Sequence, residues 1–399
     1  MAHAEDAKSP WMEFYGFFKL GPILGQNVES YGNPNSAAIT AALNPVFGAA
    51  DGGNRYLTFQ AAQTRFGFKT NKDKAITGQV EMDFMDTTKA SPTTASVPRL
   101  RMAKLDWRIN DNHTLTIGQD WDLFSPIVPH TYNWVGAMFT AGNVGFFRQQ
   151  IQYKAKVGMF ELAAAIGLQG NSNGPSLGDI EHSTTPTFAA RVAFDVPKLG
   201  RIAVNGIYTQ LHVGFRDTPM YAVGAYGDLW LSKTTNLRFE GTYGQNMNNT
   251  GMLTLGTGLA GTVGNEIDVR EAGGYISLKQ TFAEGMHGIW LAAGMSHVLN
   301  PEKLPYGYTS AVAGVPAVPG VSPAVAAVAA ARTFAANGPG ILRNIGYRLG
   351  YEFIPVKGLS LFAEGFFYNT WHKLRDGDLA KFDPTNYGFG AEMGVQYFF

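Results

Sequence analysis

The last segment of the chain alternates in polarity from one residue to the next. From Tyr387 to Tyr397 every second residue is apolar or small, and the residues between them include Glu392 and Gln396. Successive side chains of a β-strand point to opposite faces, so this period predicts a strand with one apolar and one polar face. The segment closes on an aromatic residue, Phe399. Such a C-terminal strand is typical of a closed membrane barrel, whose last strand pairs with its first.

The same period recurs along the whole chain and predicts sixteen strands. They lie at 12–25, 55–69, 75–86, 97–109, 112–121, 145–156, 159–169, 187–196, 200–212, 219–231, 236–246, 267–281, 287–298, 341–353, 359–370 and 386–399. An even number of strands is what a closed antiparallel barrel in a single bacterial chain requires.

The connections between these strands alternate in length. Tight turns rich in Gly, Pro, Asn, Asp or Lys alternate with longer, irregular segments. The long segments lie at 26–54, 87–96, 122–144, 170–186, 213–218, 247–266, 299–340 and 371–385. A barrel with both termini on the periplasmic side produces this alternation, because hairpin turns occupy one rim and external loops the other. We therefore predict an all-β fold, a transmembrane antiparallel β-barrel over 12–399, preceded by a short periplasmic segment, 1–11.

The composition agrees with a single large barrel. All-β barrels commonly use a chain of this length, 399 residues, as one domain. Only 16% of the residues are charged, yet the mean hydropathy is close to zero, at -0.08. In a barrel, apolar residues that face the lipid and polar residues that face the interior would offset each other in this mean. The formal net charge of zero gives no bulk attraction to nucleic acid, and the absence of cysteine excludes disulfides and thiolate chemistry.

Charged residues occur in the middle of the predicted strands. Glu81 and Asp83 alternate with Val80, Met82 and Phe84. Placing an Arg or Lys side chain in the lipid at the middle of the bilayer costs ~2–4 kcal/mol. These charged residues are therefore predicted to face an aqueous interior.

The inward charges form two sets. The basic set on neighbouring strands comprises Arg65, Arg99, Arg101, Arg148, Lys154 and Arg191. The acidic set includes Glu81, Asp83, Asp120, Asp122, Glu161, Asp195, Glu240, Glu352, Glu364 and Glu392. A basic ladder facing an acidic wall would lower the barrier for anions in a narrow pore. The alternative is that these residues are neutralising pairs that hold the wall together.

Two of the long connections are unusual. Segment 122–144, the third long one, is rich in aromatic residues and is flanked by Asp120, Asp122 and Arg148. We expect it to fold into the lumen and form part of a constriction, the alternative being an ordinary external loop. Segment 309–337, within the long loop 299–340, is rich in Ala, Val and Pro, and its prolines exclude a membrane-spanning helix. An apolar loop of this size should be covered by a neighbouring subunit, the lumen or a partner.

The sequence contains no convincing catalytic or metal-binding motif. Gly256 to Gly261 matches G-x-G-x-x-G, but no helical pattern follows, which indicates a flexible glycine loop. Ser125, His130 and Asp122 lie in one segment, but closeness in sequence is not the geometry of a catalytic triad. We expect no enzyme activity, no cofactor and no metal site.

Several short motifs resemble the DcaP-like family of outer-membrane porins. They are Phe14 to Leu20, Gln63 to Phe68, Pro98 to Ala103, Thr116 to Trp121 and Arg148 to Tyr153. The resemblance implies a sixteen-stranded homotrimeric diffusion channel for small anions such as dicarboxylates. By motif position, Arg65, Arg99, Arg101 and Arg148 would line its narrow part.

These observations together predict a porin in the bacterial outer membrane, surrounded by its lipid, that passes small hydrophilic solutes and prefers anionic ones. The predicted pore-lining residues are the basic set together with Glu81, Asp83, Asp120 and Asp122. A plugged or sheathing barrel that scaffolds a partner, such as an electron carrier, is the alternative, and a barrel hydrolase is the third.

Overall fold

The structure is a computed structural model, and it describes residues 11–26, 55–70, 75–85, 98–124, 127–133, 137–139, 141–145, 147–168, 185–213, 216–247, 260–262, 265–301, 341–372 and 385–399. The segment 309–337 and all of 1–11 except Trp11 lie outside these residues. Within the described part, no helix is both long enough and apolar enough to cross a membrane.

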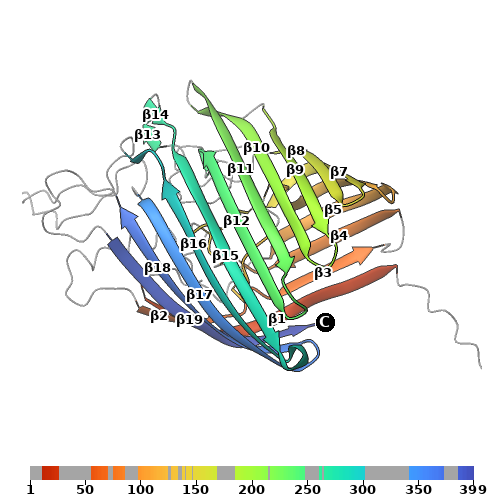
Figure 1. Cartoon of the computed structure of the whole chain (residues 1–399), viewed down its shortest axis with the longest axis vertical. Helices are drawn as coiled ribbons and strands as arrows, with labels where there is room; N and C mark the ends of the chain where they lie inside the picture. The colour runs from red at the N-terminus through yellow and green to blue at the C-terminus, as the bar shows by residue number, and fades with distance from the viewer. Residues whose placement is uncertain are drawn as a thin grey trace, which may run out of the picture.

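The chain forms a closed antiparallel barrel (Figure 1). The first half of the wall consists of β1 (Met12–Gln26), β2 (Arg55–Gln60), β3 (Arg65–Thr70), β4 (Ile76–Asp83), β5 (Arg99–Asn110), β6 (His113–Trp121), β7 (Phe147–Val157), β8 (Phe160–Gly167) and β9 (Thr187–Val196). The second half consists of β10 (Gly200–Val213), β11 (Arg216–Trp230), β12 (Thr235–Gln245), β15 (Arg270–Phe282), β16 (His287–Val298), β17 (Ile341–Val356), β18 (Leu359–His372) and β19 (Thr385–Phe398). A single 3-10 turn, Ala283–Gly285, joins β15 to β16.

The predicted sixteen strands are confirmed. The main sheet has seventeen labelled strands, and β2 and β3 both pair with β1 as two halves of one wall strand, which leaves sixteen. The predicted strand 55–69 is interrupted at 61–64, where the amide of Thr64 donates to the carbonyl of Ala61 at 3.0 Å. This turn brings the side chains of Gln63 and Thr64 against Lys19.

Two predictions about the connections were wrong. The segment 213–218 was predicted to be a long loop, but β10 and β11 extend until Val213 pairs with Arg216. A small separate hairpin, β13 (Ala260–Thr262) and β14 (Asn265–Ile267), forms in the last part of the connection 247–266, extends one residue beyond it and includes part of the predicted glycine loop. Both hairpins are held by backbone hydrogen bonds, which the side-chain pattern does not reveal.

The alternation of the strands separates an apolar exterior from a charged interior. On β5, Leu100 is 48% exposed, whereas its neighbour Arg101 is 6% exposed. Ile117 on β6 and Ile151 on β7 are exposed in the same way, and Glu81 and Arg348 are buried inside. Because the period is two, a slip of one residue would turn each strand's charges outward, so the lipid fixes the register.

The barrel closes where the C-terminus meets β1. Gly16 and Phe399 exchange backbone hydrogen bonds of 3.3 and 3.2 Å, and the ring of Phe399 lies 5.4 Å from that of Phe18. Figure 1 shows the C-terminus at the same end of the barrel as the β11–β12 turn.

Gly21 is required for this closure, because a Cβ there would lie 2.7 Å from the Cα of Gly394 on β19. We expect Gly21→Val to destabilise the barrel by about 1–3 kcal/mol through overpacking and to lower the yield of heat-modifiable, folded protein on gels. Gly241→Val is the control, since a Cβ at Gly241 on β12 meets no atom within 4 Å. Equal folded yields for the two variants would contradict this role of Gly21.

Candidate functional site

The described residues of segment 122–144 begin at one wall of the barrel. Immediately after β6, the carboxylate of Asp122 forms an ion pair of 2.6 Å with Arg148 on β7. Leu123 and Phe124 are buried in an apolar cluster with residues of β8 to β11. These contacts direct the chain inward from the end of β6.

The same segment then contacts the inward face of distant strands. The ring nitrogens of His130 lie 2.8 Å from the Ser277 hydroxyl on β15 and 2.7 Å from the Asn236 side-chain oxygen on β12. The hydroxyl of Tyr132 donates to Glu352 on β17 at 2.6 Å. Segment 122–144 therefore bridges walls that are far apart in the sequence.

Glu364 on β18 is the principal acceptor for this segment. It accepts hydrogen bonds from the Thr131 hydroxyl at 2.8 Å, the Tyr132 amide at 3.2 Å and the Trp290 indole at 2.9 Å. It also pairs with Arg348, and both side chains of that pair are completely buried. A carboxylate that accepts this many hydrogen bonds fixes the segment firmly.

Two wall glycines and one glycine of the segment allow the last part of the segment to approach the wall. A Cβ at Gly294 would collide with Ala141, one at Gly346 would lie 3.1 Å from the Cβ of Ala141, and one at Gly142 would collide with Gly274. Gly142 itself has φ +107, a conformation that favours glycine, and its amide donates to Ser296 at 2.9 Å. The segment is thus seated against strands β15, β16 and β17.

The predicted basic residues near β4 are paired with the predicted acidic ones. Arg99 lies 2.7 Å from Asp83, and Arg101 lies 2.8 Å from Glu81 and 3.1 Å from Asp83. Arg65 lies 3.4 Å from Glu81. Acidic and basic side chains therefore share this wall, as the pairing alternative describes.

The remaining predicted residues are also brought to the inner wall. Arg191 pairs with Glu161 at 2.7 Å, and Asp120 pairs with Lys104 at 2.8 Å. Lys104 was missed from the sequence, because a register shift between β4 and β5 changes which residues of β5 face inward. Arg201, which lies 2.7 Å from Asp195, and Lys19, which lies 2.5 Å from Glu392, were missed as well. Each of these two residues lies two positions from a buried residue of its own strand, Arg201 from Ala203 and Lys19 from Phe17. This alternation could have identified both as inward-facing.

The three residues considered as a triad do not form one. Ser125 lies outside the described residues, Asp122 is paired with Arg148, and His130 contacts Ser277 and Asn236. Burial, followed by the charge of Arg238, lowers the pKa of His130 from 6.5 to about 4, so this ring is neutral at ordinary pH. Over the part of the chain that the structure describes, no three metal-ligating side chains come together.

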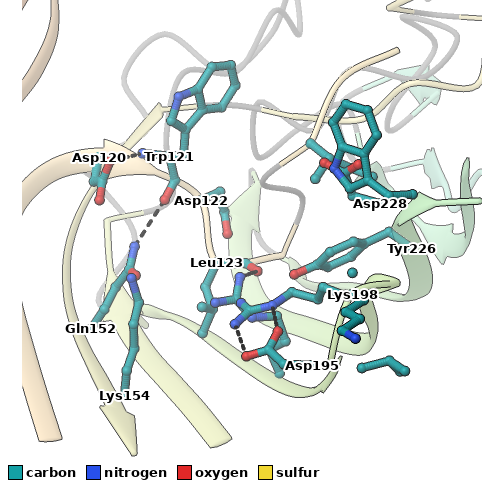
Figure 2. Close-up of a pocket in the computed structure, with 16 residues that line it drawn as sticks. Asp120, Trp121, Asp122, Leu123, Gln152, Lys154, Asp195, Lys198, Tyr226 and Asp228 are labelled. Carbon is teal, nitrogen blue, oxygen red and sulfur yellow. Dashed lines mark hydrogen bonds and ion pairs between the residues drawn. The ribbon is translucent and has the colours of Figure 1, made fainter. Parts of the chain in front are cut away.

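A cavity of about 730 Å³ lies between the start of segment 122–144 and strands β6 to β11 (Figure 2). Its four lining carboxylates are all paired: Asp120 with Lys104, Asp122 with Arg148, Asp195 with Arg201, and Asp228 with Arg238.

Two lining lysines differ from the other charges of this cavity. Arg191 and Arg201 have carboxylate partners, but Lys154 and Lys198 have no hydrogen bond or ion pair within the described residues. Figure 2 shows Lys154 and Lys198 on different sides of the cavity. The described lining therefore carries two lysines that form no ion pair with its carboxylates.

Comparison with known proteins shows the fold. No family model matches the chain, and no curated protein matches its sequence. The outer-membrane channel DcaP of Acinetobacter baumannii has a similar structure, with a TM-score of 0.68, 15% identity and 97% of each chain covered. The anion-selective porin from Comamonas acidovorans matches with a TM-score of 0.55 and 10% identity, over 97% of this chain and 99% of the other. OmpT of Vibrio cholerae matches with a TM-score of 0.55 and 12% identity, over 99% of this chain and all, 100%, of the other. The chain thus has the fold of the outer-membrane porins.

Proposed function

We propose that this protein is an integral porin of the bacterial outer membrane, which passes small hydrophilic solutes by diffusion and favours small anions such as dicarboxylates. The apolar exterior, the charged interior and the porin fold support this proposal. The resemblance to DcaP-like porins and the anion-selective neighbour support the anion preference. A homotrimer is part of the proposal, since a trimer form of OmpT is among the similar structures, with a TM-score of 0.52.

The cavity of Figure 2 is the observation that carries the anion preference. Paired charges have weak fields at a distance, because each cation is offset by a carboxylate a few ångströms away. Lys154 and Lys198 have no such partner in the described structure and would attract an anion that enters the cavity. Such a local excess of positive charge lowers the barrier for anions in a narrow pore.

The paired residues have a second role in this proposal. Arg65, Arg99, Arg101, Arg148 and Arg191 line the inner wall together with Glu81, Asp83, Asp120 and Asp122. Segment 122–144 narrows the lumen beside them. In this arrangement the arginines hold the wall and offer guanidinium groups to passing carboxylates, while Lys154 and Lys198 provide positive charge without an ion pair.

Replacement of both lysines tests this assignment. In planar bilayers under a salt gradient, Lys154→Gln/Lys198→Gln is expected to lower the anion-to-cation permeability ratio by roughly twofold to fivefold per lysine, the effect of ~0.5–1 kcal/mol between partly screened charges. Lys357→Gln is the control for the loss of a positive charge outside the cavity, because it removes one charge from the exposed β17–β18 turn. A wild type without anion preference, or a double variant with unchanged reversal potential, would refute the assignment. A folded protein without conductance would favour the plugged or sheathing barrel.

A further inference from the structure

A second cavity, of about 240 Å³, lies between residues 129–132 and the wall formed by β12, β15, β16, β17 and β19. It shares no lining residue with the cavity of Figure 2. Its volume is below the roughly 300–1,000 Å³ of sites that bind drug-sized ligands. Only a small solute fits it.

Aromatic rings form much of the lining of this cavity. Tyr132 stacks on Phe362 with centroids 4.3 Å apart and planes 5° apart, and it lies 5.5 Å from Trp290. Phe398 also lines the cavity, is 46% exposed and lies 5.5 Å from Phe17. Exposed aromatic faces beside an existing stack favour a planar ring as the occupant.

Two of the three charged side chains that line this cavity, other than His130, are cations. Arg238 and Lys279 face the cavity, and Glu352 is the carboxylate that lines it with them. Glu352 lies 2.6 Å from Lys279, whereas Arg238 is paired with Asp228 outside this lining. Burial, followed by the charges of Arg238 and Lys279, lowers the pKa of His130.

An unused amide completes the lining. Gln396 on β19 is 1% exposed, and among the described residues neither its side-chain nitrogen nor its side-chain oxygen has a hydrogen-bond partner. A buried amide without partners costs stability, so such groups in native proteins usually receive a partner from a ligand or water. A carboxylate can accept a hydrogen bond from this amide and from the neighbouring cations.

We propose that this cavity is a binding subsite for a small aromatic carboxylate, of the size of benzoate. The ring lies against Tyr132 and Phe398, and the carboxylate faces Lys279, Arg238 and Gln396. The subsite is separate from Lys154, so it goes beyond a general preference for anions.

Calorimetric titration of the refolded full chain in detergent tests this proposal, and the measurement does not depend on channel conductance. We expect benzoate to bind, and acetate and benzyl alcohol to bind roughly tenfold more weakly, since each lacks either the ring or the charge. If acetate bound as tightly as benzoate, the aromatic contact would be removed from the proposal. Equal binding of benzyl alcohol would remove the carboxylate contact, and the absence of benzoate binding would refute both.

Variants locate the subsite. Phe398→Leu and Lys279→Gln are each expected to weaken benzoate binding by about fivefold to tenfold, and Lys279→Arg should restore most of it. Phe389→Leu is the matched control, because Phe389 is on the same strand but faces outward and is 44% exposed. Lys357→Gln, in the exposed β17–β18 turn, should leave benzoate binding unchanged, and a loss of benzoate binding in Lys154→Gln would transfer the site to the other cavity. Benzoate binding in a protein that shows no conductance would refute the proposed porin function and leave this subsite intact.

Discussion

Replacing Glu364 by leucine is expected to release segment 122–144 and to raise the single-channel conductance about twofold or more, because pore diameter limits the current. Glu364 accepts hydrogen bonds from Thr131, Tyr132 and Trp290 in addition to its ion pair with Arg348. Without the carboxylate, Arg348 would lose its buried ion pair with Glu364, and breaking such a pair by removing one partner costs ~3–5 kcal/mol. Outward movement of the segment would admit water to Arg348 and lower this cost. Bilayer recordings measure the conductance, and thermal melting measures the lost stability.

Two further variants separate the hydrogen bonds from the buried charge. Glu364→Gln keeps one acceptor for Thr131 and should have a smaller effect on conductance. Glu364→Leu/Arg348→Leu removes both charges, so stability should recover while the contacts to Thr131 and Tyr132 remain lost. Wild-type conductance in the double variant would show that the other contacts hold the segment without Glu364, and would contradict its role as principal acceptor.

The sequence was sufficient to predict the barrel because lipid acts on every strand in the same way. Strands β9 and β16 begin and end at the predicted residues, Thr187–Val196 and His287–Val298. Each outward residue there must be apolar and each charge must face inward, which imposes the period of two. Outside the part of each strand that contacts lipid, the lipid no longer imposes this period of two. The extension of β10 and β11 to Val213 and Arg216 and the hairpin β13–β14 depend on backbone pairing, and they were missed.

The inward charges were also predictable, but their partners were not. Arg101 and Glu81 could each be assigned to the interior from their neighbours, whereas their ion pair of 2.8 Å requires knowledge of the register between β4 and β5. That register contains a shift, and the shift is also the reason why Lys104 was not predicted to face inward. The contact between Thr131 and Glu364 joins residues 233 positions apart and depends on the path of a loop. No periodic pattern encodes that path.

The ion pairs determine what removal of the arginines should do. Arg99, Arg101 and Arg148 hold Asp83, Glu81 and Asp122 at 2.6 to 2.8 Å, so the triple replacement by alanine leaves these carboxylates without those partners. In the proposed porin this change of three charges should lower the anion-to-cation permeability ratio by at least about tenfold and make the channel cation-selective, since several unscreened charges act together.

A charge-balanced control distinguishes a paired wall from a free arginine ladder. Arg99→Ala/Asp83→Ala removes one cation and one anion, so it should leave the reversal potential in a salt gradient near that of the wild type. If Arg99 acted independently of Asp83, this double variant would instead lose anion preference as much as Arg99→Ala alone. If the triple variant also kept its anion preference, the arginines would have no part in selectivity, and Lys154 and Lys198 alone would carry it.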